Sequence, residues 1–186
     1  GGIMRDVFCM GARPLANIDC LRFGHKSSEH SKWLVSEVVR GIAHYSNCVG
    51  VATVGGNISF DKSYAGNCLV NVMCLGLAKE KEIFTGKATG IGNQVIYVGA
   101  ATGRDGIHGA TMASDVFAED TSSNKGVIQV GDPFYEKLLI EATLEILSEN
   151  LVVGLQDMGA AGLSSSLFEM ASRGKVGVYL DLDKVP

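Results

Sequence analysis

The stretch LQDMGAAGLSSS, residues 155–166, places one carboxylate beside a turn that has almost no side chains. An apolar run leads into Asp157, glycine and alanine fill positions 159–162, and three serines follow. We expect a buried strand over 151–156, then a tight turn, then a short helix over 165–172. A helix N-terminus offers free N–H groups and a partial positive charge, and small residues let a phosphate approach the backbone.

Asp157 beside this turn has two interpretations. Mg²⁺ usually takes one or two carboxylates together with phosphate oxygens and water, so the arrangement suits a magnesium–nucleotide site. Alternatively, Asp157 only caps the turn, and the glycines permit a sharp bend between strand and helix. The chain contains no glycine loop that ends in Gly-Lys-Ser or Gly-Lys-Thr, which excludes a Walker A loop.

The composition is that of a globular protein of 186 residues, 46% hydrophobic and 19% charged. The net charge of −4 and the lack of a Lys/Arg cluster argue against a nucleic-acid partner. No apolar stretch approaches the roughly 20 residues of a membrane span, and no signal peptide is visible. The five cysteines form no CxxC pair, which favours reduced thiols in a cytoplasmic protein.

Hydrophobic periodicity predicts most of the remaining elements. Two segments, 3–10 and 31–45, have the spacing of amphipathic helices. The predicted strands cover 15–23, 49–54, 58–60, 69–78, 94–98, 127–130 and 176–182. The polar stretch 114–126 predicts a domain boundary, with one domain over 1–115, a linker over 116–126 and a second domain over 127–186.

The segment GDPFYEKLLIEATLEIL, residues 131–147, predicts a third helix. Asp132 suits the N-cap, and Pro133 suits the first helical position. The expected buried stripe consists of Leu138, Leu139, Ala142, Ile146 and Leu147.

Two further segments are candidates for ligand binding. GRDGIHGATMAS, residues 103–114, is either a ligand loop or a surface turn. In GGIMRDVFCMGARP, residues 1–14, Arg5 and Asp6 are neighbours, so on a helix their side chains point about 100° apart. One could hold an anion and the other a cation, or both could be solvated charges on the first turn.

Six segments, taken together and in order, resemble formylglycinamidine ribonucleotide synthase. They are GGIMRDVFCMGARPLANIDCLRFG, NCLVNVMCLGL, VIYVGAATGRDGIHGATMAS, IQVGDPFYEKLLIEATLEIL, LQDMGAAGLSSSLFEMA and VYLDLDKVP. The resemblance is to the synthetase subunit of the small, multi-subunit type and runs nearly end to end. It implies the aminoimidazole ribonucleotide synthetase-like fold: part of an N-terminal α+β domain that forms a barrel-like interface, then the start of a C-terminal α/β domain.

The resemblance also implies a reaction in purine biosynthesis. ATP activates an amide oxygen of formylglycinamide ribonucleotide as a phosphoryl ester, and ammonia from a glutaminase subunit displaces the phosphate to leave an amidine. Mg²⁺ and ATP are the implied cofactors, and a small accessory subunit completes the complex. The implied substrate contacts are Arg5 and Gln129, and the implied Mg²⁺ ligands are Asp6 and Asp157. Asn57 stands where the family commonly has Glu.

The ends of the chain suggest an internal piece of a longer protein, because it starts at Gly1 without methionine and stops at Pro186 after a strand-like run. The family's SHNHP segment, with the catalytic histidine, would precede Gly1, and its ESQ segment would follow Pro186. We therefore expect no catalytic residue in this chain and no activity from it alone. Two alternatives are a sister synthetase or kinase of the superfamily, and a non-catalytic structural half.

Overall fold

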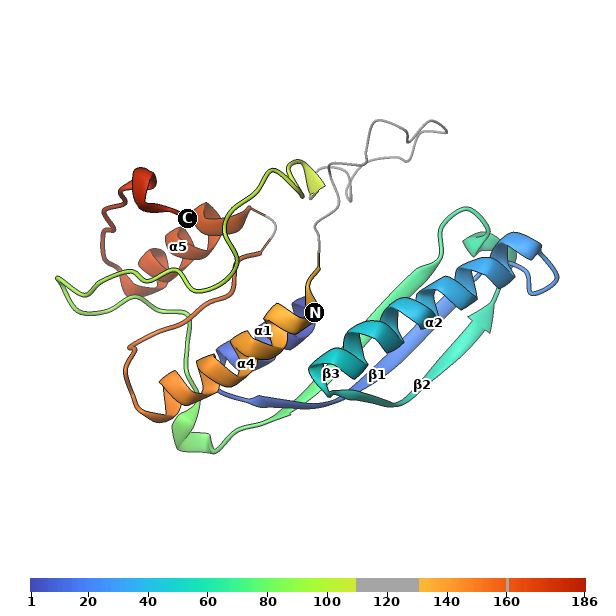
Figure 1. The fold of residues 1–186 in the computed structure, drawn as a ribbon, viewed down its shortest axis with the longest axis horizontal. Helices are drawn as coiled ribbons and strands as arrows, with labels where there is room; N and C mark the ends of the chain where they lie inside the picture. The colour runs from blue at the N-terminus through green and yellow to red at the C-terminus, as the bar shows by residue number, and fades with distance from the viewer. Residues whose placement is uncertain (110–130, 160) are drawn as a thin grey trace.

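The structure is a computed structural model that describes residues 1–109, 131–159 and 161–186 (Figure 1). The predicted linker over 116–126, the predicted strand over 127–130 and the candidate contact Gln129 lie outside these residues.

A three-stranded sheet in the order β2-β1-β3 forms the first half of the molecule. The central strand β1 (Arg13–Phe23) pairs in parallel with β2 (Ala52–Phe60) and antiparallel with β3 (Leu69–Leu77). Side chains alternate between the two faces of a strand, and from Asn17 onward every second residue of β1 is buried. These buried residues are Asn17, Asp19, Leu21 and Phe23.

The predicted strands over 49–54 and 58–60 are wrong in their bounds, since a single strand β2 contains the second half of the first and all of the second. Val49 belongs to the helix α2 (Glu29–Val49), which ends at Gly50 in the left-handed conformation with φ 82°. Gly56 continues the strand instead of turning. Its φ is 142°, and a Cβ there would run into the Asp19 backbone carbonyl, so the close approach of β2 to β1 requires glycine.

Helix α2 lies along one face of the sheet, and the short helix α1 (Gly2–Cys9) lies beside α4 (Pro133–Ser148) (Figure 1). The predicted α2 stripe is half-buried, as its amphipathic pattern requires. It consists of Leu34, Val38, Ile42 and Tyr45. Helix α5 (Gly162–Gly174) begins earlier than its predicted start at 165.

Helix α4 begins as predicted, because the Asp132 carboxylate accepts hydrogen bonds from the backbone N–H groups of Phe134 and Tyr135 at 3.0 and 3.1 Å. The predicted buried stripe is largely wrong. The buried residues are Pro133, Glu136, Ile140, Thr143 and Leu147. The stripe is displaced because α4 turns a partly polar face toward α1 and α2, which a pattern based on hydrophobicity alone does not show.

One apolar cluster joins the start of the chain to α4. Met4 and Phe8 of α1 pack with Val49, the last residue of α2, with Val51 after it, and with Ile140 of α4. This packing holds α4 against a helix that lies more than 120 positions earlier in the sequence. The cluster therefore fixes the position of α1, which carries the first candidate site residues.

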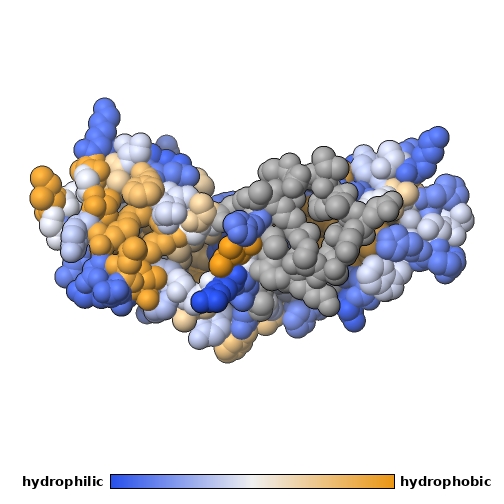
Figure 2. All heavy atoms as spheres, turned by 90° about the horizontal axis from the view of Figure 1, so that it is seen from above, coloured by the Kyte–Doolittle hydropathy of each residue, from blue (hydrophilic) through white to orange (hydrophobic). Residues whose placement is uncertain are grey.

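The predicted strands over 94–98, 151–156 and 176–182 are wrong, since none forms a ladder within the described part of the chain. A strand needs a hydrogen-bonded neighbour, which an apolar sequence pattern does not supply. Large apolar side chains of these segments and of α5 are exposed, and apolar residues form a patch at one end of the molecule (Figure 2). Examples of the exposed side chains are Leu151, Val153, Phe168, Tyr179 and Leu182. Among residues 1–109, 131–159 and 161–186, no helix has the length and apolar character needed to cross a bilayer.

An exposed ion pair between β1 and α4 gives a test of pH-dependent stability. Arg13 donates through Nη1 and Nη2 to the two carboxylate oxygens of Glu141, at 2.8 Å each, and Lys137 donates to Oε1 at 2.6 Å. These donors lower the pKa of Glu141 to about 2. A depressed folded-state pKa stabilises the protein above the ordinary carboxyl range, and this contribution is lost as the pH falls through the folded value.

We expect Glu141→Gln to reduce the free energy of unfolding at pH 7 by about 0.2–1 kcal/mol, since both partners are nearly half exposed. The difference from wild type should close as the pH falls from the ordinary range, about 4.3, toward the folded-state pKa. Urea unfolding of wild type and Glu141→Gln at a series of pH values measures this difference in unfolding free energy. A difference that stays constant down to pH about 2 would contradict the ion-pair explanation.

Candidate functional site

Arg5 of α1 lies between two carboxylates from distant parts of the chain. Its Nη1 donates to Glu136 Oε2 at 3.4 Å, and its Nε lies 3.6 Å from Asp157 Oδ2. The Glu136 side chain is only 5% exposed and that of Asp157 is 19% exposed, whereas that of Arg5 is 33% exposed. The guanidinium is therefore anchored on its buried side and accessible on the other.

A tyrosine from α2 completes the contacts of Glu136. The Tyr45 hydroxyl donates to Glu136 Oε2 at 2.6 Å. Burial, and secondarily this hydrogen bond, raise the pKa of the Tyr45 phenol above its ordinary value, so Tyr45 remains a donor. Gly1 lies so close to Tyr45 that a Cβ on Gly1 would run into the Tyr45 hydroxyl. Helices α1, α2 and α4 thus meet at one carboxylate.

Asp6 and Asp157, the two predicted metal ligands, lie together. Burial raises the pKa of Asp157, and the negative charge of Asp6 raises it further, while Arg5 opposes both effects. The Cys9 thiol faces the same pair: burial, then the charges of Asp157 and Asp6, raise its pKa to about 12. Cys9 therefore stays protonated at neutral pH and is not a thiolate ligand or nucleophile.

The Asp6–Asp157 pair fits one kind of metal site. Two carboxylates that repel each other at close range favour a cation between them. Within residues 1–109, 131–159 and 161–186, no group of three or more His, Cys, Asp or Glu residues is arranged to hold a metal ion. The pair thus suits Mg²⁺ that takes its remaining ligands from phosphate and water, and it does not suit an all-protein metal cage.

Among the described residues, no contact of Asp157 supports its alternative role as a turn cap. Helix α5 begins at Gly162 after the N-cap residue Ala161, and no side chain caps it. The Asp157 carboxylate instead pairs with Arg5. The predicted site residues Arg5, Asp6 and Asp157 are therefore brought together across the chain.

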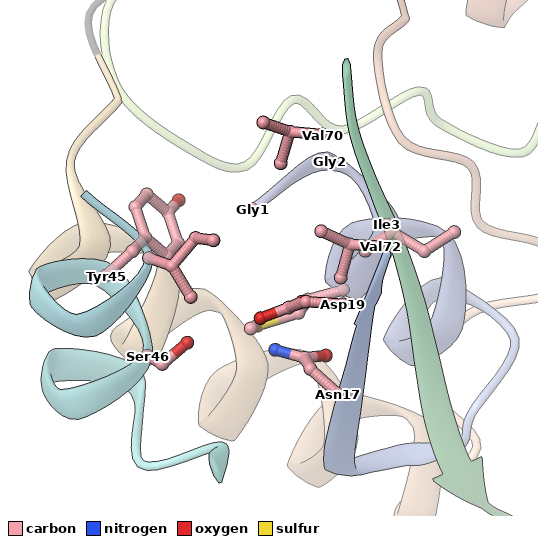
Figure 3. Close-up of a pocket in the computed structure, with 11 residues that line it drawn as sticks. Gly1, Gly2, Ile3, Asn17, Asp19, Tyr45, Ser46, Val70 and Val72 are labelled. Atoms are coloured by element: carbon pink, nitrogen blue, oxygen red, sulfur yellow. The ribbon is translucent and has the colours of Figure 1, made fainter. Parts of the chain in front are cut away.

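A pocket of about 340 Å³ is lined by Tyr45, which donates to Glu136, and by Gly1 and Gly2 at the start of the chain (Figure 3). Asn17 and Asp19 line it from β1, and both are more than nine-tenths buried. Thr53 donates to Asp19 Oδ2 at 2.9 Å, while Asn17 Oδ1 and Asp19 Oδ1 have no protein partner among the described residues. Two polar residues spaced by two, ahead of Leu21 in the same strand, are the sequence signal for this polar wall.

The candidate loop over 103–114 is mostly exposed in its described portion, 103–109, and its remainder lies outside the described residues. Its role as a ligand loop stays a prediction. Asn57 lies on the exposed strand β2 and accepts a hydrogen bond from Arg22 Nη1 at 2.6 Å.

Comparison with known proteins identifies the family. Residues 1–78 match "AIR synthase related protein, N-terminal domain", and residues 90–186 match "AIR synthase related protein, C-terminal domain". The chain belongs to the AIR synthase related family. The N-terminal match ends at residue 78 and the C-terminal match begins at residue 90, so the gap between them lies upstream of the predicted linker at 116–126. The linker stays a prediction. The predicted fold, partial N-terminal and C-terminal domains of this superfamily, is confirmed.

Several of the proteins similar to the chain are named PurL. This chain is 60% identical over 191 residues to "Phosphoribosylformylglycinamidine synthase subunit PurL" of Sulfurimonas denitrificans, across 100% of this chain and 26% of that protein. The structure "T. maritima PurL complexed with FGAR" is 43% identical, with a TM-score of 0.86, across 100% of this chain and 29% of that one. "T. maritima PurL complexed with ATP" is 40% identical, with a TM-score of 0.78, and 27% of it is covered. The chain thus spans about a quarter of the length of these relatives.

Proposed function

We propose that this chain is part of a phosphoribosylformylglycinamidine synthase, an ATP-dependent ligase that converts formylglycinamide ribonucleotide (FGAR) to the amidine in purine biosynthesis. The observation that carries the proposal is the match to part of PurL over the whole of this chain, including a PurL structure with FGAR, combined with the Arg5–Asp6–Asp157 cluster. The whole enzyme would draw ammonia from a glutaminase subunit, contain a small accessory subunit and work in the cytoplasm.

The residues of the cluster would contribute different interactions to the binding of an anionic substrate. Arg5 presents accessible N–H donors that suit a phosphate or a developing oxyanion. Asp6 and Asp157 would hold Mg²⁺, which when bound would neutralise phosphate charge during phosphoryl transfer. Asp6 comes from α1 and Asp157 from the segment before α5, so the two halves of the chain must be docked for both to act. Gln129 is a proposed further substrate contact.

The proposed substrate role of Arg5 predicts the effect of its replacement. In the intact synthase that contains this chain, we expect Arg5→Met to raise the KM for FGAR about 10- to 100-fold, because a charge-assisted contact is worth about 1.5–3 kcal/mol. The KM for ATP should change little. Steady-state kinetics with FGAR, ATP and ammonia measure both values.

The matched control is Arg173→Met, which removes an arginine on α5 that pairs with Glu169 at 3.3 Å. Its FGAR kinetics should stay near those of wild type. A synthase with no FGAR-dependent ATP hydrolysis would refute the proposed function. An unchanged KM for FGAR in Arg5→Met would refute the assignment of Arg5.

A further inference from the structure

We propose that Glu136, held by Tyr45, is a positioning residue that orients the Arg5 guanidinium toward the substrate. The proposal rests on the proposed function, because it takes Arg5 to be the substrate contact. It concerns a residue that has no substrate contact of its own assigned and that lies 131 positions from Arg5 in the sequence.

The burial of Glu136 is the first observation behind the proposal. Its side chain is 5% exposed and lies on the packing face of α4, which also carries Pro133, Ile140, Thr143 and Leu147. Burying a carboxylate is costly unless it is paired and hydrogen-bonded, and an apolar residue of similar size commonly packs at such a position at lower cost. Stability alone therefore does not explain a carboxylate on this face. A role in fixing the orientation of the Arg5 guanidinium does explain it.

The geometry at Arg5 is the second observation. A guanidinium is planar and has five N–H donors in a rigid fork. Glu136 takes the Nη1 side at 3.4 Å and Asp157 takes Nε at 3.6 Å, so two carboxylates from different segments define the plane of the group. The hydrogen bond of Arg5 to a carboxylate within the described part of the chain comes from Nη1, and Nη2 makes none there. This nitrogen lies on the Gly2 side, where a Cβ on Gly2 would come within 3.6 Å of it. The small residue leaves room for a ligand at that edge.

Tyr45 supplies the third observation, because it fixes Glu136 in turn. Its hydroxyl donates to Oε2, the same oxygen that accepts from Arg5. The oxygen is therefore held from α2 while it holds a side chain of α1. An arginine whose orientation is set before binding loses less conformational freedom when the ligand arrives, and this loss would otherwise weaken substrate binding.

The test uses the intact synthase with Glu136→Gln and, separately, Tyr45→Phe. We expect Glu136→Gln to raise the KM for FGAR about 5- to 50-fold and Tyr45→Phe to raise it about 3- to 10-fold. The KM for ATP should stay within about twofold of wild type, because only the orientation of Arg5 is disturbed. Calorimetric titration with FGAR alone should show the same weakening. Tyr45→Phe keeps the ring, so it tests the proposal even if Glu136→Gln fails to fold.

The matched control is Glu141→Gln, which breaks a carboxylate–arginine pair on the same helix at Arg13. It should leave the KM for FGAR unchanged. A general loss of packing would instead lower Tm in the Glu136 and Tyr45 variants while leaving the affinity for FGAR intact, and that result would overturn the proposal.

The double variant Arg5→Met/Glu136→Gln separates the two proposals. If Glu136 acts through Arg5, Glu136→Gln should change FGAR affinity less than about twofold once Arg5 is gone. Equal effects in both backgrounds would overturn the positioning role and leave the proposed function standing. An unchanged affinity in Arg5→Met alone would overturn both the assignment of Arg5 and the inference built on it.

Discussion

Asp157→Asn in the intact synthase is expected to lower turnover about 10- to 100-fold or more and to shift the Mg²⁺ midpoint to higher concentration. Asp157 lies beside Asp6 and pairs with Arg5 at 3.6 Å. Asparagine keeps the size of the side chain and removes its charge, so the variant loses a metal ligand and leaves phosphate charge less neutralised. Turnover measured against Mg²⁺ concentration tests this expectation.

The same variant should not destabilise the metal-free protein. The pKa of Asp157 is raised in the folded state by burial and by Asp6. A carboxyl with a raised folded-state pKa costs no stability when it is protonated in both states, and the cost appears as the pH rises through the raised value. At pH 7, Asp157→Asn should therefore have a Tm equal to or above that of wild type, and the difference should vanish in acid. A residue that only capped a turn would show neither the kinetic loss nor this pH dependence.

Two companion variants complete the experiment. Asp6→Asn should show a similar shift of the Mg²⁺ midpoint, because Asp6 is the other proposed ligand. Asp61→Asn removes a carboxylate that caps the short helix η1 (Lys62–Tyr64) and should leave the midpoint unchanged. Near-normal turnover with an unshifted midpoint in both Asp6→Asn and Asp157→Asn would refute the metal assignment.

Much of the fold follows from the sequence wherever an element carries its own signal. The amphipathic spacing over 31–45 predicted α2, and the Asp132-Pro133 pair predicted where α4 begins. Elements that depend on distant partners were harder to predict. The run over 151–156 has the composition of a buried strand, yet no neighbour pairs with it within the described residues. Strand formation needs a ladder, whereas a helix satisfies its own backbone.

The candidate site likewise combines residues that were predicted from the sequence with residues that were not. The resemblance implied site roles for Arg5, Asp6 and Asp157, whose residue types suit phosphate and magnesium chemistry, and the structure brings them together. Glu136 and Tyr45 were missed as parts of the site. A glutamate in the first turn of a helix is most simply explained by the helix dipole. Only the packing of α4 against α1 and α2 buries it and turns it toward an arginine from the start of the chain.

Phe8→Ala is expected to cost about 3–5 kcal/mol of unfolding free energy, the usual range for removing a buried aromatic ring. Phe8 is 3% exposed and packs in the cluster with Met4, Val49 and Ile140. The substitution removes the ring that holds α1 against α4, and the cavity closes only in part. Urea unfolding of the chain measures the loss.

The control Phe134→Ala removes the same ring from the first turn of α4, where Phe134 is 62% exposed, and should cost less than about 1 kcal/mol. A cost below about 1 kcal/mol for Phe8→Ala would contradict the packing. The functional consequence follows from the position of α1. This helix carries both Arg5 and Asp6, so a loosened α1 moves the arginine away from Glu136 and the carboxylate away from Asp157. In the intact synthase, Phe8→Ala should therefore weaken FGAR binding and the Mg²⁺ response together, whereas Arg5→Met and Asp6→Asn should each affect mainly one of them.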